Sequence, residues 1–316
     1  TEGSDRSHTA IFARTMGLPT IVAVGKNFTS KYEGLFAIVD GNSGKIYIDP
    51  DESTITRFKE IKKTDDSQKS HLEEFRGKIT VTRSGRKINL YANSGSLADI
   101  DLIKASDAEG IGLFRSEYIF MQAHDYPTED YQLDIYKNVL EQMEGKKVII
   151  RTLDIGADKT AEYFMLKPED NPAMGVRAIR LCLQNKAIFK TQLRALYRAS
   201  VYGNLSIMVP LITSVEEVLE TKKIIQEVKT ELKQQNLAFN DNVEFGIMIE
   251  TPAAALISDE LAKVVDFFSI GTNDLTQFTL AADRQNADLT KYLNPYHHAV
   301  VRLIEMTNKN AHACGI

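Results

Sequence analysis

The apolar run Val264-Val-Asp-Phe-Phe-Ser-Ile270 leads directly into Gly271-Thr-Asn-Asp-Leu275, and this junction decides the fold. The first part has the composition of a buried strand, and the second places an amide and a carboxylate just past the end of that strand. Two further apolar runs end in the same way, at Arg151 and at Glu250. Charged side chains at the carboxyl ends of buried strands are typical of α/β barrels and sheets, whose chemistry lies at that edge.

From Lys87 onward, expected strands alternate with expected helices, and this alternation predicts a parallel sheet. The strands are expected at residues 88–92, 110–114, 148–151, 205–211, 245–250 and 267–270, and helices at 130–143, 174–183 and 214–232. A doubly wound sheet is the alternative fold. Polar residues at nearly every strand end favour a (β/α)8 TIM-type barrel of which about six strands are visible.

The first part of the chain has a different pattern. A helix is expected over residues 9–14, and short strands separated by glycine-rich turns are expected at 21–24, 36–39 and 45–48. The charged segment that follows spaces apolar residues at helical intervals, with a polar stretch at 64–68 that predicts a bend. We therefore expect three parts: an α/β module at 1–50, a helical linker at 51–80 and a barrel at 81–316.

Composition sets the broad class of protein. A chain of 316 residues with 43% hydrophobic content can form a large barrel and a smaller module. A net charge of −5 gives no electrostatic reason to expect nucleic acid or a membrane surface. The sequence has no apolar run of transmembrane length and no visible signal peptide, and its two cysteines fit neither a disulfide framework nor a zinc site. These features predict a soluble, cytoplasmic protein without membrane insertion.

Three arginines lie near predicted strand ends: Arg115, Arg151 and Arg284. A guanidinium stays charged at any working pH and can bind phosphate or carboxylate through two hydrogen bonds. The alternative is simple ion pairing, of Arg115 with Glu117 and of Arg151 with Asp154. Several arginines at neighbouring strand ends favour a site for a small, highly anionic ligand. Arg177, within an expected helix, either supports the residues that contact the ligand or is structural.

Glu250 and Asp274 are the candidate metal ligands. Magnesium prefers hard oxygen ligands and usually takes one or two carboxylates, with waters and substrate phosphate completing its shell. Helix capping is the alternative role for both residues, although Thr251 could supply the cap beside Glu250. The sequence therefore predicts Mg²⁺ as the cofactor.

His8 ends the polar stretch Gly3-Ser-Asp-Arg-Ser-His8, just ahead of the expected helix at 9–14. A neutral imidazole is a nucleophile near neutral pH, and a helix N-terminus favours a phosphoryl group. A surface histidine beside a turn is the alternative on local sequence alone.

The chain resembles the Enzyme I family of the bacterial sugar phosphotransferase system, the phosphoenolpyruvate–protein phosphotransferases. The resemblance covers essentially the whole chain through ordered motifs at residues 7–14, 110–121, 151–159, 171–180, 246–252 and 269–277. Pyruvate phosphate dikinase and phosphoenolpyruvate synthase are related alternatives. Thr9 directly after His8, and the Arg115-Ser-Glu117 context, favour Enzyme I.

The resemblance implies a role for each candidate residue. His8 would accept the phosphoryl group on a swivelling domain, and the group would then pass to the histidine-containing phosphocarrier protein HPr, with pyruvate released. A homodimer formed through the barrel is also implied. The implied ligands of phosphoenolpyruvate are Arg115, Arg151, Asn273 and Arg284, and those of Mg²⁺ are Glu250 and Asp274.

The chain departs from the family pattern in three places. Gly3-Ser4, followed by Asp5-Arg6, stands where the family has a double glycine. The family's carrier-binding domain, which precedes the histidine, is not in this sequence. The family's Gly-Met-Cys-Gly motif, whose cysteine protonates the enolate, would follow Ile316, so that role is not given to Cys314. We therefore expect an internal fragment with an incomplete barrel, and a fragment that binds phosphoenolpyruvate without transferring phosphate is an alternative.

Overall fold

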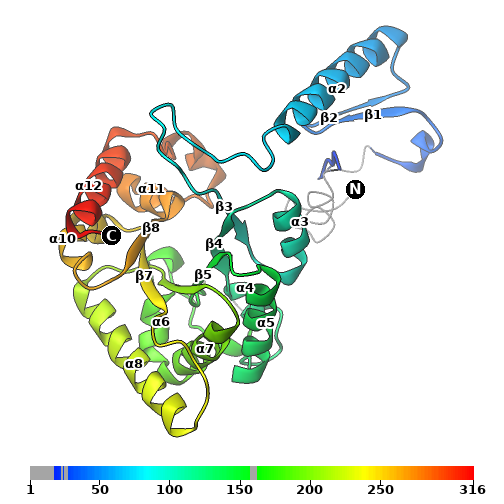
Figure 1. Ribbon diagram of the computed structural model, residues 1–316. Helices are drawn as coiled ribbons and strands as arrows, with labels where there is room; N and C mark the ends of the chain where they lie inside the picture. Colours follow the sequence, from blue (N-terminus) through cyan, green and yellow to red (C-terminus); the bar gives the residue numbers. More distant parts are fainter. Residues whose placement is uncertain (1–17, 23, 25–27, 157–161) are drawn as a thin grey trace. The chain divides into compact units, whose positions relative to one another are not determined.

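The computed structural model of the chain describes residues 18–22, 24, 28–156 and 162–316. It divides into two units, Thr1–Lys78 and Ile79–Ile316 (Figure 1). His8 and the expected helix at 9–14 lie outside the described residues, so both predictions stay predictions.

The described part of the first unit contains an antiparallel hairpin and a long helix. The elements are the 3-10 turn η1 (Ser30–Tyr32), strands β1 (Ala37–Asp40) and β2 (Lys45–Ile48), and helix α2 (Glu52–Glu73). The strand expected at 45–48 is confirmed, and the one expected at 36–39 is displaced by a single residue. The strand expected at 21–24 is wrong for its described residues 21, 22 and 24, none of which is in a strand.

Helix α2 is continuous through the polar stretch at 64–68, so the stretch does not interrupt the helix, and the expected bend stays a prediction. Asp51 caps its N-terminus by accepting a hydrogen bond from the backbone amide of Thr54 at 2.8 Å. The ring of Phe58 lies 5.0 Å from that of Tyr47, so the start of α2 packs on β2. No described residue of α2 is buried, and polar side chains that face solvent cost a helix little.

The second unit is a parallel sheet of six strands, in the order β3-β4-β5-β6-β7-β8, with a helical segment after each strand. The strands are β3 (Tyr91–Ser94), β4 (Gly110–Arg115), β5 (Lys147–Arg151), β6 (Leu205–Val209), β7 (Glu244–Ile249) and β8 (Phe267–Ile270). The α-helices are α3 (Ile100–Ala105), α4 (Glu117–Met121), α5 (Glu129–Gln142), α6 (Ile179–Gln184), α7 (Lys186–Ala199), α8 (Val215–Gln234), α9 (Pro252–Leu256), α10 (Ser258–Leu261), α11 (Thr272–Leu280) and α12 (His298–Cys314). Short 3-10 turns are η2 (Leu97–Asp99), η3 (Glu162–Phe164), η4 (Pro172–Met174), η5 (Ser200–Tyr202) and η6 (Ala287–Tyr292).

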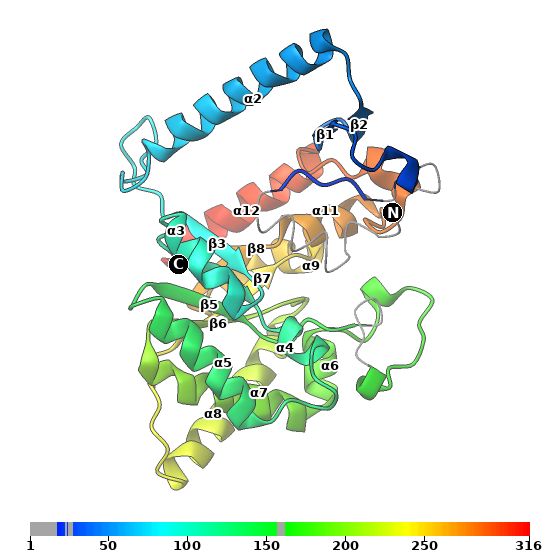
Figure 2. The ribbon, with the colours of Figure 1, turned by 90° about the vertical axis from the view of Figure 1, so that its right-hand side faces the viewer.

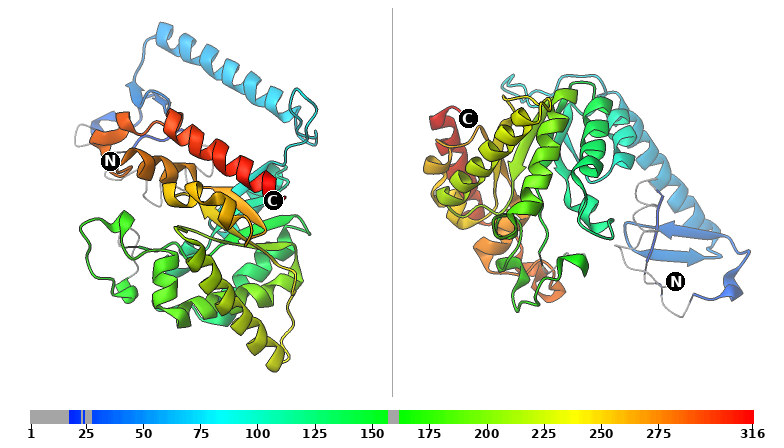
Figure 3. Two further views of the ribbon diagram at one scale, coloured as in Figure 1. Left: turned by 90° about the vertical axis from the view of Figure 1, so that its left-hand side faces the viewer. Right: turned by 90° about the horizontal axis from the view of Figure 1, so that it is seen from below.

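The sheet is curled, with helices α5, α7 and α8 on its outer side (Figure 2). Its outer face and these helices share one large apolar core. Its inner face carries a small cluster of Ile149, Met208 and Met248. In the part of the chain that the structure describes, β3 and β8 are the free edges of the sheet, and Figure 3 shows the curl from two further sides. The expected architecture, a (β/α)8-type barrel with six strands, is thus confirmed.

Two sequence predictions in this unit are wrong in detail. The first strand begins at Tyr91 rather than at residue 88, because the amide of Ile88 donates to the Thr80 carbonyl in a short hairpin. The helix expected at 174–183 is interrupted. It starts only at Ile179, because Ala178 adopts φ 50° and ψ −126°, which is far from helical geometry.

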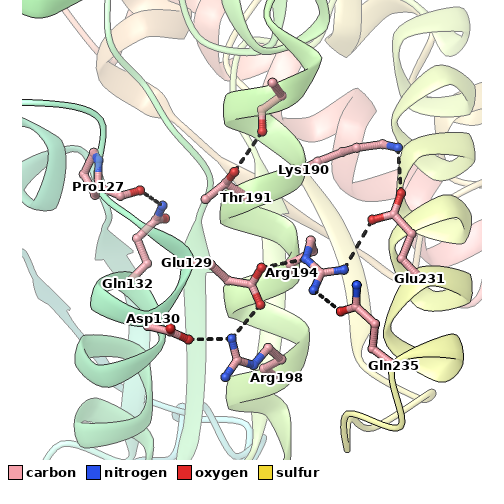
Figure 4. Close-up of polar contacts among 11 residues, drawn as sticks. Pro127, Glu129, Asp130, Gln132, Lys190, Thr191, Arg194, Arg198, Glu231 and Gln235 are labelled. Carbon is pink, nitrogen blue, oxygen red and sulfur yellow. Dashed lines mark hydrogen bonds and ion pairs between the residues drawn. The ribbon is translucent and has the colours of Figure 1, made fainter.

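Helix α7 is tied to both of its neighbours by side-chain ion pairs (Figure 4). Arg194 and Arg198 each donate to the Glu129 carboxylate of α5 at 2.6 Å. Arg194 also donates to Glu231 at 3.3 Å and to Gln235 at 2.7 Å, at the end of α8. Because one carboxylate accepts from two guanidinium groups of limited exposure, this network fixes α7 between α5 and α8.

We expect Glu129→Gln to lower the free energy of unfolding by about 1–2 kcal/mol, because it leaves two partly buried guanidinium groups without their shared anion. Urea denaturation measures the change. Glu305→Gln is the matched control, since Glu305 pairs with Lys309 on a solvent-exposed helix face, and it should have no measurable effect. Equal effects of the two substitutions would contradict a structural role for the network.

In the described residues, no helix is both long and apolar enough to cross a membrane.

Candidate active site

The predicted site residues of the barrel lie at the carboxyl edge of the sheet. Arg115 ends β4 and Arg151 ends β5, and the two are direct partners in the parallel register. Glu250 follows β7, and Asp274 lies in the first turn of α11, which follows β8. The carboxyl ends of parallel strands meet at one edge, so residues far apart in sequence share one region.

Arg151 is at the centre of a buried ion-pair cluster. Its side chain is 7% exposed, and its Nη2 lies 2.6 Å from Glu117 Oε1 and 3.0 Å from Asp154 Oδ2. Burial alone would lower the pKa of this guanidinium, but the negative charges of Asp154, Glu117 and Glu250 outweigh burial and raise it. Arg151 therefore stays cationic.

Of the two ion pairs considered from the sequence, the one between Arg151 and Asp154 is present. The one between Arg115 and Glu117 is not, because Glu117 contacts Arg151.

Arg177 belongs to the same cluster, which favours the supporting role over the purely structural one. Its side chain is 1% exposed, and its Nη2 lies 2.8 Å from Asp154 Oδ1. Its Nη1 lies 4.0 Å from Asp274 Oδ1, so Arg177 joins the strand-end carboxylates of β5 and β8. The sequence carries no local signal for this position, because Arg177 leaves the regular helix only through the positive φ of Ala178 in the folded chain.

Arg115 differs from the other arginines of the site. Its side chain is half-buried, and within the described residues it takes part in no ion pair. Arg284 is intermediate, because its Nη2 lies 3.5 Å from Asp274 Oδ1 while its side chain is 31% exposed. Asn273 is exposed in the first turn of α11. Arg115, Arg284 and Asn273 therefore have hydrogen-bonding capacity available for a ligand.

Glu250 is almost fully buried at 1% exposure, and its Oε1 accepts a hydrogen bond from the Leu211 amide at 2.6 Å. Thr251, not Glu250, caps the following helix by accepting from the Ala254 amide. Burial, followed by the charges of Asp154 and Asp274, raises the pKa of the Glu250 carboxyl to about 8. The Glu250 carboxyl therefore holds its proton near neutral pH, and a cation bound beside it would favour the ionised form.

Asp274 is the second candidate metal ligand. Its Oδ1 is buried and accepts no hydrogen bond in the described residues, and Gly271, not Asp274, occupies the N-cap position of α11. A buried carboxylate oxygen that has arginines at 3.5 and 4.0 Å but accepts no hydrogen bond fits a hard divalent cation such as Mg²⁺. In the described part of the chain no group of three or more His, Cys, Asp or Glu residues could hold a metal alone. A cation here would therefore need oxygens from a ligand and from water.

Gly271 allows this arrangement by its lack of a side chain. A Cβ at this position would lie 2.8 Å from Glu250 Cβ and Oε2 and 3.0 Å from Met248 Sδ. These distances are shorter than van der Waals contact, so a methyl group would displace Glu250.

We predict that Gly271→Ala lowers the free energy of unfolding by about 1–3 kcal/mol through this overpacking. Denaturant titration at fixed pH tests the change. At Gly41 a Cβ would meet nothing nearer than 3.9 Å, so Gly41→Ala serves as the control and should change stability little. A neutral Gly271→Ala would show that Glu250 is not confined as described.

The raised pKa of Glu250 predicts a pH-dependent stability in metal-free solution. Between about pH 4.5 and 8 the unfolded carboxyl is ionised while the folded one still holds its proton, so folding becomes less favourable as pH rises. We expect Glu250→Gln to match the parent chain near pH 4.5 and to exceed its stability near pH 8 by on the order of 2–4 kcal/mol. Denaturation of both chains with EDTA across this range measures the difference, and parallel curves would contradict the prediction.

Comparisons with known proteins find family matches along the chain. Residues 69–316 match the family model described as PEP-utilising enzyme, PEP-binding domain, and residues 1–44 match PEP-utilising enzyme, mobile domain. Proteins named phosphoenolpyruvate-protein phosphotransferase from Priestia megaterium and Bacillus subtilis (strain 168) are each 44% identical to this chain over 313 residues. The alignments cover 99% of this chain and 55% of each relative, so the chain spans about half the length of the curated relatives it matches.

A more distant similarity is to a solved structure. A citrate lyase from Burkholderia xenovorans LB400 aligns at a TM-score of 0.45 with 16% identity, over 72% of this chain and 62% of that chain. The two family models together account for most of the sequence, including every strand of the sheet and both candidate metal ligands. The chain therefore belongs to the PEP-utilising enzyme family.

Proposed function

We propose that the protein is a phosphoenolpyruvate-dependent phosphotransferase that accepts the phosphoryl group on His8. The observation that carries this proposal is the half-buried guanidinium of Arg115, which takes part in no ion pair with the residues that the structure describes and is in register with Arg151 at the edge that also holds Glu250 and Asp274. The shared name of the curated relatives, phosphoenolpyruvate-protein phosphotransferase, supports the same reaction.

The substrate class follows from the charges of the site. Phosphoenolpyruvate carries a phosphate and a carboxylate close together. Each of these groups can accept bidentate hydrogen bonds from a guanidinium. In the proposal, Arg115 and Arg284 bind these groups and Arg151 supplies a fixed positive charge beneath them. Asn273 donates a hydrogen bond from the exposed first turn of α11.

Mg²⁺ is the proposed cofactor, with Glu250 and Asp274 as its protein ligands. Their fit rests on the buried Asp274 oxygen, which accepts no hydrogen bond in the described residues, and on the buried Glu250 carboxyl, whose pKa is raised by burial and then by the charges of Asp154 and Asp274. When bound, Mg²⁺ would neutralise charge on the phosphate oxygens. Glu250 must be ionised to bind a cation, so the affinity for Mg²⁺ should rise as pH approaches and passes about 8.

The proposed reaction needs positioning and charge neutralisation more than covalent help from the barrel. A ring nitrogen of His8 forms a bond to phosphorus as the bond from phosphorus to the enol oxygen breaks. The arginines offset the charge that develops on the leaving enolate. The enolate then takes up a proton at carbon to give pyruvate.

The organisation and partners of the whole protein are also proposals. Residues 1–50 would be part of the mobile phosphohistidine domain, 51–80 its helical linker and 81–316 the phosphoenolpyruvate-binding barrel. We propose that phosphohistidine passes its group to the carrier protein HPr in sugar uptake, that the protein acts in the cytoplasm, and that it forms a homodimer through the barrel. The names of the relatives support the transfer of phosphate to a protein.

We expect His8→Ala to abolish protein labelling by phosphoenolpyruvate that carries ³²P on phosphate, in the presence of Mg²⁺. Its affinity for phosphoenolpyruvate, measured by isothermal titration calorimetry, should stay within about twofold, because His8 accepts the group and does not hold the ligand. The label should be acid-labile and base-stable, as a phosphohistidine is.

Arg115→Gln is the complementary variant. It should weaken phosphoenolpyruvate binding by about 2–3 kcal/mol, through loss of a charged hydrogen-bonding contact, and should reduce labelling with it. Labelling that survives in His8→Ala would refute the assigned acceptor. Unchanged binding in Arg115→Gln would remove that residue from the ligand site.

A further inference from the structure

The buried side-chain amide of Gln192 forms hydrogen bonds with two loops of the candidate site. Gln192, on α7, is 1% exposed. Its Oε1 accepts a hydrogen bond from the backbone amide of Leu153 at 3.0 Å. Its Nε2 donates to Ser116 Oγ at 2.9 Å and to the Tyr136 hydroxyl at 3.2 Å. All three of these hydrogen-bond partners are themselves buried.

Two of these partners are neighbours of the charged site residues. Ser116 lies between Arg115 at the end of β4 and Glu117, which contacts Arg151. Leu153 lies in the loop after β5 and directly precedes Asp154, which contacts Arg151 and Arg177. Gln192 thus connects the loop after β4 with the loop after β5, and none of its hydrogen bonds in the described residues is to a charged group.

Only a side chain with both a donor and an acceptor can make this connection. An apolar side chain of the same length would leave the Leu153 amide and the Ser116 hydroxyl without their partner in a buried region. The ion pairs of Arg151 with Glu117 and Asp154 also join these loops, through charged side chains. The amide of Gln192 adds a second link, which holds the Leu153 backbone directly.

The helix that carries Gln192 is itself fixed. Arg194 and Arg198, on the same helix, make the ion pairs to α5 and α8 described above (Figure 4). The ion pairs of α7 with α5 and α8 therefore fix the position of Gln192. The two loops are fixed in turn by their hydrogen bonds to Gln192.

We propose that Gln192 is a positioning residue that holds the loops after β4 and β5 as one rigid unit, so that Arg115 and Arg151 present a preformed pair of cations to an anionic ligand. The ligand part of this inference rests on the function proposed above. The bracing of the loops rests on the hydrogen bonds alone.

The test compares two substitutions of buried glutamines with methionine. Gln192→Met removes the link between the loops at nearly constant volume. Gln132→Met is the matched control. Gln132 is fully buried, accepts from the Tyr136 hydroxyl at 3.2 Å and donates to the Pro127 carbonyl at 2.9 Å, and neither bond reaches the two strand-end loops. Both variants lose buried hydrogen bonds, so a general loss of stability should affect both.

Two measurements are made below the melting temperature of every chain. Titration calorimetry with phosphoenolpyruvate and Mg²⁺ should show binding weakened by about ten- to a hundredfold in Gln192→Met, as expected when a preorganised site is loosened, and by less than about twofold in Gln132→Met. Hydrogen–deuterium exchange without ligand should be faster at residues 115–117 and 151–154 in Gln192→Met alone.

Each result has a distinct meaning. If the parent chain does not bind phosphoenolpyruvate, the proposed function fails, and the exchange data still decide whether Gln192 braces the loops. If the two variants show the same exchange at both loops, the bracing role is overturned. If exchange rises only in Gln192→Met while affinity stays equal in all three chains, the loops are braced but their spacing does not set ligand affinity, and the proposal is overturned in that part.

Discussion

The structure of the site depends on one constraint, which is the burial of opposite charges at the carboxyl edge of the sheet. Arg151, Arg177, Glu117 and Asp154 are each at most 7% exposed in their side chains. Charges so deeply buried are tolerated only when they are paired and hydrogen-bonded, and removal of one partner is more costly than the pair is stabilising. The geometry of the cluster is therefore tightly set, and the strand ends that carry it are tightly set as well.

The charged groups of the site that are not fully paired could bind a ligand. The deeply buried arginines are neutralised by carboxylates, whereas Arg115 is not paired within the described residues and Arg284 is only partly engaged. On the acidic side, Glu250 has a raised pKa and Asp274 has a buried oxygen without a hydrogen bond in the described chain. A small polyanion together with a divalent cation would satisfy both sides at once. The buried amide of Gln192 and the ion pairs of α7 support this edge from the outer layer of the fold.

Much of this arrangement was predictable from sequence, because apolar runs that end in charged residues mark the strands and their carboxyl ends. The parallel architecture, the strand at Phe267–Ile270 and the grouping of Arg151, Glu250 and Asp274 follow from that pattern. The partner of Glu117 and the role of Arg177 did not, because both depend on which loops meet in space. The unusual backbone at Ala178 interrupts a helical pattern. It is set by tertiary contacts such as the hydrogen bond that the Ala178 amide donates to the Ile155 carbonyl. The network around Gln192 links residues up to 76 positions apart and has no local signature.

The central claim is that Glu250 and Asp274 hold a divalent cation beside an arginine-bound anion. Anomalous diffraction from crystals of the chain grown with Mn²⁺ and phosphoenolpyruvate tests it most directly, because manganese scatters anomalously and substitutes for magnesium at oxygen sites. The account predicts a manganese peak bonded to carboxylate oxygens of both residues, with the phosphate of the ligand between that ion and Arg115. A peak elsewhere, or ordered ligand bound away from this edge of the sheet, would contradict it.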